Sequence, residues 1–376
     1  MRIELVKASE IEPAMWQAFA TLRDADCLYD NPFFDPEFAQ IAAEARSDVH
    51  VIIASEGDTL VAFWPVHCRG GDWARPVGGP FSDWHGPVRA KGCDISPMTL
   101  LEGAGLAGFT AFAMPTELSQ MAEDTKTRCG ANMTDLSAGW DVYRDNQQKL
   151  FPKHFKKIRR VSRNLEKDFT EIEYIMDDRC DKAFDWLIAR KREQYQRTGR
   201  HDVLGPQWAS DMLGRLRTHQ GARMRGRLST LRVDGKLAAA EFNLVSDRIV
   251  HGWITVYDAD FAKYAPGFLL LHEMLRRMPM CGLSLYDSGP GLDHYKKYYT
   301  NFQIPMDSGI ILPAGVSASP SRILGGSWRA AEARAPARMA HLMGKVRRRS
   351  DQILLAETDL AGRAKGYARA ILPVHI

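Results

Sequence analysis

The apolar and polar positions of the first 115 residues alternate in a way that predicts a mixed α/β structure. Residues 49–55 (VHVIIAS) form an unbroken apolar run, and a second run covers 59–67 (TLVAFWPVH). The intervening sequence EGD is rich in turn-forming residues, so the two runs are expected to pair as a β-hairpin. The other elements expected here are a helix at 36–45, small helices between 97 and 120, and a strand near 132–136.

The second half has a more regular succession of elements. Strands are expected at 224–233, 236–245 and 248–257, and the tight turns DG and SD join them into an antiparallel meander. A helix at 267–278 and a strand at 283–287 follow, which form a right-handed βαβ unit with the third strand of the meander. Helices at 182–198 and 207–219 precede the meander, and a short helix at 294–300 and a strand at 304–312 complete this half.

Residues 149–167 lie between the halves and predict a basic amphipathic helix. The segment holds eight Lys or Arg and one Glu, and its apolar residues recur at helical spacing. The basic face is a candidate binding surface for the phosphate of a nucleotide sugar, a lipid or tRNA, and a solvated helix face is the simpler explanation. No recognised nucleic-acid module accompanies it, so a nucleic-acid partner is not expected. The apolar stripe consists of Phe155, Ile158, Val161 and Leu165.

The C-terminal tail carries the basic character of the protein. From Ser321 onward there are 11 Lys or Arg and 4 Asp or Glu, in a chain whose net charge is only +4. The tail is expected to form a basic amphipathic helix. Such a helix either lies on an anionic membrane surface or packs on the rest of the protein. Pro336 is expected to kink it. Apolar residues spaced by three or four form a stripe of Leu324, Trp328, Ala331, Ala335, Met339, Leu342 and Val346.

The composition predicts a globular protein of two or three domains. The 376 residues are 45 % hydrophobic and 26 % charged, which is an ordinary balance for a folded chain. The six cysteines lie far apart without metal-ligand spacing, so we expect reduced thiols and no metal. The sequence lacks an apolar signal core and any run of 18 apolar residues, which predicts a cytoplasmic protein, peripheral at the inner membrane if the tail recruits it. Motifs of hydrolases, kinases and metalloproteases are absent from the sequence.

The start of the helix at 267–278 is a candidate anion site. Proline at position 266 fits the first turn of a helix, and Gly267 permits a ligand to approach the backbone closely. Unpaired N–H groups and the helix dipole favour a pyrophosphate there. The order of meander, helix and strand resembles the acyl-CoA-binding core of GNAT acetyltransferases, which implies that the strands on either side of this helix splay apart and that their backbone groups pair with a pantetheine arm as with another strand.

The order of elements and several motifs resemble a known enzyme family. The order resembles the acyl-CoA-binding core of GNAT acetyltransferases, and residues 149–305 resemble the CelD-like acetyltransferases of exopolysaccharide, cellulose or holdfast biosynthesis. That group is itself similar to the FemAB peptidoglycan aminoacyltransferases. The matching motifs are LAAAEFNL at 237–244, YDADFAKYAPGFLL at 257–270 and YDSGPGLDHYKKYYT at 286–300, with NPFFDPEF at 31–38 and SDWHGPV at 82–88 in the first half.

The resemblance implies an α/β tandem GNAT fold, in which two mixed-sheet halves face a cleft. Its expected parts are an N-terminal half at 1–148, a C-terminal half with the basic connector and the donor site at 149–315, and a basic helical tail at 316–376. It also implies acetyl-CoA as the co-substrate. One motif departs from ordinary GNAT enzymes, because Gln/Arg-x-x-Gly-x-Gly/Ala is replaced here by Tyr264, Gly267 and Leu269. The cofactor-binding candidates are Val256, Tyr257, Tyr264, Pro266, Gly267, Phe268 and Leu269.

Glu241 and Asp287 are the candidate catalytic acids. Glu241 lies within an apolar strand, where a carboxylate needs partners or takes up a proton more readily, as suits a general base. Alternatively, Glu241 is a charged side chain that faces outward from an alternating strand, and Asp287 caps the glycine loop that follows it. His251 is a further possible base or a core histidine. The resemblance implies that Tyr295 protonates the leaving thiolate, and the substrate-binding candidates are Trp84, His85, Arg159 and Lys296.

These observations favour transfer of an acetyl group from acetyl-CoA to the amine of an amino sugar in a surface-polysaccharide precursor. The acceptor is expected to be a small molecule or a lipid-linked sugar. Two alternatives stay open. One is an aminoacyl-tRNA-dependent transferase acting on a peptidoglycan precursor, and the other is a catalytically inactive GNAT scaffold in polysaccharide synthesis.

Overall fold

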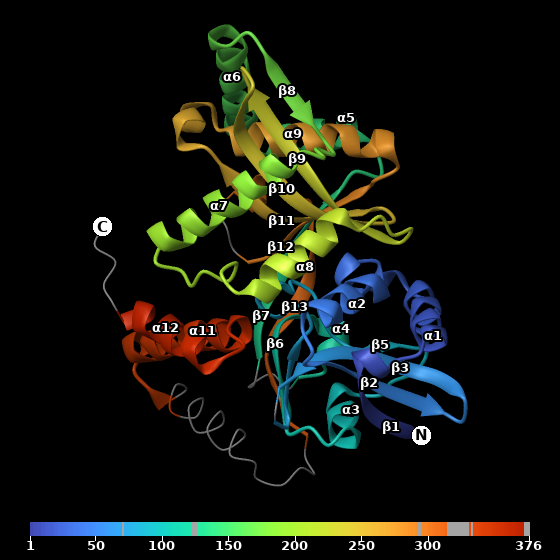
Figure 1. Ribbon diagram of the computed structural model, residues 1–376. Helices are drawn as coiled ribbons and strands as arrows, with labels where there is room; N and C mark the ends of the chain where they lie inside the picture. The colour runs from blue at the N-terminus through green and yellow to red at the C-terminus, as the bar shows by residue number, and fades with distance from the viewer. Residues whose placement is uncertain (70, 122–125, 292–294, 314–330, 332–333, 372–376) are drawn as a thin grey trace.

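The computed structural model describes residues 1–69, 71–121, 126–291, 295–313, 331 and 334–371. Its strands form one continuous sheet in the order β1-β2-β3-β4-β6-β13-β7-β12-β11-β10-β9-β8, with β5 paired to β3. Figure 1 shows this sheet running through both halves of the molecule. The strands are β1 (Arg2–Lys7), β2 (Val49–Glu56), β3 (Thr59–Cys68), β4 (Trp73–Pro76), β5 (Val88–Arg89), β6 (Gly108–Pro115), β7 (Lys126–Asp135), β8 (Ile172–Ile175), β9 (Met224–Val233), β10 (Lys236–Ser246), β11 (Ile249–Tyr257), β12 (Leu285–Pro290) and β13 (Phe302–Ile311).

Local sequence chemistry explains where several elements begin and end, although the helices at Pro13–Asp24 and Trp140–Leu150 were not predicted. Asp35 caps the helix that starts at Pro36, by accepting a hydrogen bond from the Glu37 N–H. Asp234 and Gly235 both have positive φ in the turn between β9 and β10, as a tight hairpin requires. The helices are α1 (Pro13–Asp24), α2 (Pro36–Ala45), α3 (Pro97–Gly103), α4 (Thr116–Ser119), α5 (Trp140–Leu150), α6 (Pro152–Asp168), α7 (Asp181–Arg197), α8 (Gln207–Thr218), α9 (Pro266–Arg277), α11 (Ala337–Ala356) and α12 (Leu360–Ile371).

The two halves exchange strands in the middle of the sheet. β7 of the first half lies between β12 and β13 of the second half, and β13 in turn lies between β7 and β6. Met133 of β7 pairs with Asp287 on one side and with Phe302 on the other. Backbone hydrogen bonds therefore join the halves directly, so that their relative position is set by the sheet.

Helices cover both faces of the second half of the sheet. The predicted apolar stripe of α6 is buried, and it packs with α9 against one face. α7 and α8 cover the opposite face, where α8 also packs against α2 of the first half. Each face of β10 and β11 is thus closed by apolar side chains, and the polar groups described below are enclosed between these layers.

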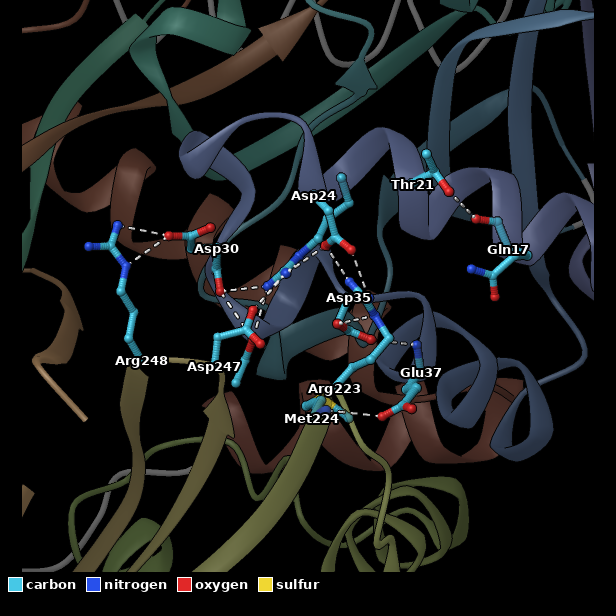
Figure 2. Close-up of polar contacts among 12 residues, drawn as sticks. Gln17, Thr21, Asp24, Asp30, Asp35, Glu37, Arg223, Met224, Asp247 and Arg248 are labelled. Atoms are coloured by element: carbon cyan, nitrogen blue, oxygen red, sulfur yellow. Dashed lines mark hydrogen bonds and ion pairs between the residues drawn. The ribbon is translucent and has the colours of Figure 1, made fainter. Parts of the chain in front are cut away.

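Salt bridges join the ends of the second-half strands to the first half (Figure 2). The buried guanidinium of Arg23 donates to Asp247 at 2.9 Å, and Arg223 donates to Asp24 at 2.9 Å. Arg248 donates to Asp30 at 2.8 Å. Guanidinium groups and carboxylates from the two halves form hydrogen-bonded ion pairs here. These ion pairs hold the halves together next to the strand exchange.

Three details differ from the sequence-based expectations. The region 97–120 contains only two short helices, and its apolar centre forms strand β6 between β4 and β13. A short apolar run is compatible with a buried strand as well as with a helix, so periodicity could not separate them. Of the helix expected at 294–300, the described part is a short 3-10 helix at Lys296–Tyr298. β12 also continues beyond Asp287 into the expected loop and ends at Pro290.

The tail packs on both halves through the C-terminal end of α11. The guanidinium of Arg46 donates to the Leu355 carbonyl at 3.0 Å, and the Trp208 indole donates to the Ala356 carbonyl at 2.7 Å. These donors satisfy carbonyls that the last turn of a helix leaves unpaired. Pro336 directly precedes α11, so the helix that was expected to run across this proline is interrupted there and begins again at Ala337.

The N-terminal part of α11 keeps apolar side chains at the surface. Met339 is 57 % exposed, Leu342 60 % and Val346 47 %. These residues belong to the predicted stripe, whose first members, Leu324 and Trp328, lie outside the described residues. Among the described helices, none is both long and apolar enough to cross a bilayer.

Candidate functional site

β11 and β12 separate after a short stretch of pairing. They pair in parallel at Ile249 with Leu285, and the last pair is His251 with Asp287. Beyond that point β11 continues beside β10, while β12 continues beside β7 and pairs through Pro290 with Ala131. The expected splay is confirmed, and it opens at the carboxyl ends of two parallel strands, where open α/β sheets place ligands.

Glu241 lies on β10 beside the opening and is buried among three hydrogen-bond donors. Its Oε1 accepts from the Tyr286 hydroxyl at 2.7 Å and from the Asn243 amide at 2.6 Å. Its Oε2 accepts from the Thr255 hydroxyl at 3.1 Å. A buried carboxylate with several donors has a fixed geometry, so the hydroxyl of Tyr286 is held at a defined position where the strands part.

The contact between Tyr286 and Glu241 depends on glycine at position 252. A Cβ atom at Gly252 would overlap the Tyr286 hydroxyl and would lie 2.9 Å from Oε1 of Glu241. Burial raises the pKa of Tyr286 well above its usual value, and the charge of Glu241 and the nearby Tyr295 add to this effect. Tyr286 therefore stays a neutral donor toward Glu241 at physiological pH.

Asp287 points away from Glu241 and joins the two halves. Its Oδ2 accepts from His251 Nδ1 at 2.7 Å, from the Trp84 indole at 2.6 Å and from the Asn31 amide at 2.9 Å. Its Oδ1 accepts from the Gly289 N–H at 2.7 Å. Asn31 and Trp84 come from the two motifs of the first half, NPFFDPEF and SDWHGPV, which explains why those motifs accompany the motifs of the second half.

His251 lies between two carboxylates. Its Nδ1 faces Asp287, and its Nε2 lies 3.1 Å from Oδ2 of Asp83, whose side chain is 36 % exposed. Burial would lower the pKa of His251, but the two carboxylates outweigh it and raise this pKa to about 9. Burial would raise the pKa of Asp287, and His251 together with the surrounding donors lowers it instead. At neutral pH the pair is an imidazolium and a carboxylate, and a carboxylate whose pKa is lowered is a weaker acceptor for the proton of an amine than one whose pKa is raised.

The expected anion site at the start of α9 opens to space on one side. Ala265 has a φ of 51° and its carbonyl accepts the Phe268 N–H at 3.0 Å, which forms the first turn after Pro266. A Cβ atom at Gly267 would meet nothing within 4 Å. A ligand can therefore approach the backbone at this glycine without displacing a side chain of the described residues.

The comparisons with known proteins agree with this geometry. Residues 152–297 match the family described as acetyltransferase (GNAT) domain. This part of the chain is a GNAT acetyltransferase domain. It begins at α6 and includes the meander, the splayed strands and α9. No protein of curated function matches the chain.

Solved structures share the fold of the GNAT domain and of the half before it. The C-terminal domain of a protein assigned as a lysylphosphatidylglycerol synthetase from Agrobacterium fabrum is 15 % identical, with a TM-score of 0.50, over 84 % of this chain and 96 % of that chain. FemX is 9 % identical with a TM-score of 0.49, over 78 % and 95 %. A tandem GNAT protein from the clavulanic acid biosynthesis pathway is 9 % identical with a TM-score of 0.46, over 85 % and 100 %. The predicted α/β fold is confirmed, and at these identities the likeness concerns the fold alone.

The other cofactor-binding candidates of the GNAT domain lie around the splay with different exposures. Tyr257 is exposed at the end of β11, whereas Val256 is buried. Tyr264 is buried and its hydroxyl donates to Asp168, so it ties the start of α9 to the end of α6. Leu269 is buried, and Phe268 is half-buried next to Tyr295. Their roles in binding stay predictions.

The substrate-binding candidates do not lie together. Trp84 reaches Asp287, but His85 accepts the backbone N–H of Phe112 within the first half, and burial lowers its pKa to about 3. Lys296 is buried, and its ammonium donates to the Pro290 carbonyl at 2.8 Å. Arg159 lies on α6 and donates to Gln148. Of these four candidates, only Trp84 and Lys296 therefore contact β12, at Asp287 and at Pro290.

Sequence reasoning missed several residues of the GNAT site. Tyr286 precedes Asp287 in the motif YDSGPG, and because neighbours on a strand face opposite sides, each joins a different network. Asn31 and Asp83 belong to first-half motifs that were noticed only as matches to the family. The sequence did carry a signal for them, because Asn31 and Asp83 are polar residues inside segments that are otherwise rich in aromatic residues.

Proposed function

We propose that the protein is an acyl-CoA-dependent N-acyltransferase that moves an acetyl group to the amine of an amino sugar in a surface-polysaccharide precursor. The observation that carries the proposal is the separation of β11 and β12, the two strands that α9 connects, after His251 and Asp287. The resemblance of the motifs to CelD-like acetyltransferases supports the amino-sugar acceptor, as a small molecule or a lipid-linked sugar.

The donor would be held mainly by the backbone. The edge of β11 from Gly252 to Tyr257 is the part that β12 leaves, and it offers N–H and C=O groups to the amide bonds of a pantetheine arm. The start of α9 supplies the N–H of Gly267 and the positive end of the helix dipole for the pyrophosphate. In this arrangement the thioester end of the donor would face the point where the strands meet.

The Tyr286 hydroxyl and the Glu241 carboxylate together can remove the proton of the amine. The amine nitrogen attacks the thioester carbonyl, a C–N bond forms and the C–S bond breaks. The proton of the amine passes to the Tyr286 oxygen while the Tyr286 proton passes to Oε1 of Glu241, across the hydrogen bond of 2.7 Å. The departing thiolate takes a proton from Tyr295, whose ring lies against Phe268 at the start of α9.

Transfer assays with the purified full-length chain test this proposal. Acetyl-CoA and a panel of amino sugars, free and nucleotide-linked, should yield free CoA thiol and an N-acetylated sugar detected by mass spectrometry. A parallel assay uses charged tRNA as the donor. Aminoacyl transfer without use of acetyl-CoA would replace the proposal by the tRNA-dependent reaction. Binding of a sugar precursor without transfer from either donor would favour the inactive scaffold.

The tail supports a place for this reaction at a membrane surface. The exposed residues Met339, Leu342 and Val346 lie on one side of α11, and Arg338 next to them is exposed as well. Apolar side chains flanked by arginine match the acyl boundary and the anionic headgroups of a bilayer. Contact with an anionic membrane would bring the enzyme to lipid-linked acceptors.

A further inference from the structure

A hollow lies next to the start of α9, between that helix and α6. It has a volume of about 660 Å³ and is lined at one end by the start of α6, including Phe151, Lys153 and His154. At the other end Phe268 and Tyr298 line it. The volume is within the range of pockets that bind small molecules and cofactors.

Aromatic rings make up half of the residues that line this cavity. The ring of His154 stacks on Tyr298 with centroids 4.0 Å apart and planes inclined by 5°. Phe268 meets His154 edge-on at 5.3 Å, and Phe151 meets Tyr298 edge-on at 5.3 Å. Phe151, His154, Phe268 and Tyr298 are only half-buried. Half-buried rings around a hollow are a surface on which a planar base can stack.

The charged groups of the cavity are of one sign. Lys153 and Lys157 both line it from α6, four residues apart and hence on the same face of the helix. Among the described residues the lining contains no carboxylate. Burial and the neighbouring Lys157 lower the pKa of His154 to about 4, so the imidazole is neutral and adds no competing charge. The two ammonium groups beside apolar rings suit a phosphorylated ligand.

The neighbouring groove along α6 has a different character. It has a volume of about 630 Å³ and contains Arg159 and Arg163 together with Glu166 and Glu273. Glu273 forms ion pairs with Arg276 at 2.7 Å and with Arg277 at 2.5 Å. Mixed charges do not select an anion, so the phosphate-binding character is concentrated at the Lys153 end of α6.

The aromatic cavity is connected to the proposed reaction centre by Tyr295. Tyr295 lines the cavity and meets Phe268 edge-on at 6.1 Å. It also lies near enough to Tyr286 to affect the ionisation of that hydroxyl. A ligand whose base occupies the cavity could therefore extend past Tyr295 toward the splayed strands.

We propose that this cavity binds the nucleotide end of a substrate, with the base against His154, Phe268 and Tyr298 and the phosphates at Lys153 and Lys157. The proposal rests on the proposed acyl transfer, in which two substrates have this chemistry. One is acyl-CoA, through its phosphorylated adenosine, and the other is an acceptor sugar activated with a nucleoside diphosphate. The basic character of α6 thereby has a function in substrate binding that extends beyond a solvated helix face.

Calorimetric titration of the full-length chain tests the assignment. The ligands are CoA, dephospho-CoA, adenosine 3′,5′-bisphosphate and a uridine-diphosphate amino sugar. The variant is Lys153→Ala/Lys157→Ala. The matched control is Lys156→Ala/Arg160→Ala, because these residues have the same spacing on the same helix and are likewise exposed, but they do not line the cavity. Circular dichroism and thermal unfolding confirm that both variants fold.

The expected result is a loss of affinity of roughly tenfold in the lysine variant, as for one lost charge-assisted contact, and no change in the control. Loss for CoA and the bisphosphate, with a smaller loss for dephospho-CoA, identifies the donor as the occupant. Loss for the sugar nucleotide alone identifies the acceptor. Equal CoA binding by wild type and lysine variant, with no effect on the sugar nucleotide, overturns the cavity assignment and leaves the acyl-transfer proposal intact. Wild-type protein that binds none of these nucleotides overturns both.

Discussion

The hydroxyl of Tyr286 donates a hydrogen bond of 2.7 Å to Oε1 of Glu241 at the point where β11 and β12 separate. Tyr286 comes from the strand after α9 and Glu241 from the middle of the meander, so the contact forms only when the whole unit is folded. Glycine at position 252 leaves the space that the hydroxyl occupies. This relationship gives the proposed mechanism its proton acceptor and makes its parts separately testable.

Replacing Glu241 by glutamine should lower kcat by roughly 10²-fold, the range for loss of a general base. The side-chain amide can still accept from Tyr286 and donate to Thr255, so the variant should fold and bind CoA with nearly unchanged affinity. Tyr295→Phe should lower kcat in the same direction but less, if its hydroxyl protonates the thiolate. Steady-state kinetics with the identified acceptor and a CoA titration of each variant provide the measurement. Unchanged turnover in Glu241→Gln would remove this residue as the base.

Gly252→Ala should displace the Tyr286 hydroxyl from Glu241. An added methyl group in a packed site costs about 1–3 kcal/mol of unfolding free energy, and turnover should fall because the proton path is broken. Tyr286→Phe removes the nearest of the atoms that the new methyl group would meet, the hydroxyl oxygen, and leaves the ring carbon Cζ at 2.6 Å. The double variant should therefore lose less stability than the sum of the two single variants, in a cycle measured by urea unfolding. Additive losses would show that the two residues do not compete for this space.

The pair of His251 and Asp287 should make stability depend on pH. The pKa of His251 is raised to about 9 in the folded protein, above its value of about 6.5 in an unfolded chain. The stabilisation is thus fully present below about pH 6.5 and is lost as the pH rises through 9, with a total on the order of 3 kcal/mol.

Urea unfolding of wild type and His251→Gln across this range measures the effect. The free energy of unfolding of the variant should be below that of the wild type at pH 6, and the difference should narrow by pH 10. Asp287→Asn should lower stability most at low pH within this range, because it leaves the buried imidazolium without its main partner. A difference that is constant with pH would mean that His251 is not charged in the folded protein.

Gly267→Val should weaken CoA binding by roughly tenfold, equivalent to about 1.4 kcal/mol, because the side chain would occupy the open space beside the first turn of α9. Gly214→Val is the matched control. Gly214 also lies in a helix, α8, and a Cβ atom there would meet nothing within 4 Å, but the position is not near the splay. Calorimetry with CoA compares the two variants, and equal affinity in both would argue against pyrophosphate binding at the start of α9.

The exposed stripe of α11 should mediate contact with anionic lipid. Flotation of the full-length chain with vesicles containing phosphatidylglycerol is expected to bring protein to the lipid fraction, and with neutral vesicles much less. Leu342→Glu/Val346→Glu should abolish flotation, whereas Met280→Glu, an exposed methionine elsewhere, should not. These substitutions leave the docked end of α11 at Leu355 and Ala356 untouched. Equal flotation of all three proteins would exclude the stripe as the membrane contact.

Local patterns were sufficient for most elements of the second half. β9 begins and ends where the alternating sequence predicts, at Met224 and Val233, and the buried stripe of α6 contains the predicted residues. The Pro-Gly start of α9 was also predicted. These features depend on side-chain periodicity and turn chemistry within a few residues, which the sequence carries directly.

The partners of the candidate acids depend on contacts that no local pattern encodes. Glu241 and Asp287 were identified from their positions on strands, but Asp287 is joined to Trp84 across 203 positions of the chain and to Asn31 across 256. The exchange of β7 and β13 brings the two halves together and so places first-half side chains at the end of β12. The ionisation of His251 follows from that placement, because two carboxylates of distant origin meet at one buried ring. Sequence periodicity assigns a residue to a strand and a face, whereas the pairing of distant strands determines which charges share the same low-dielectric space.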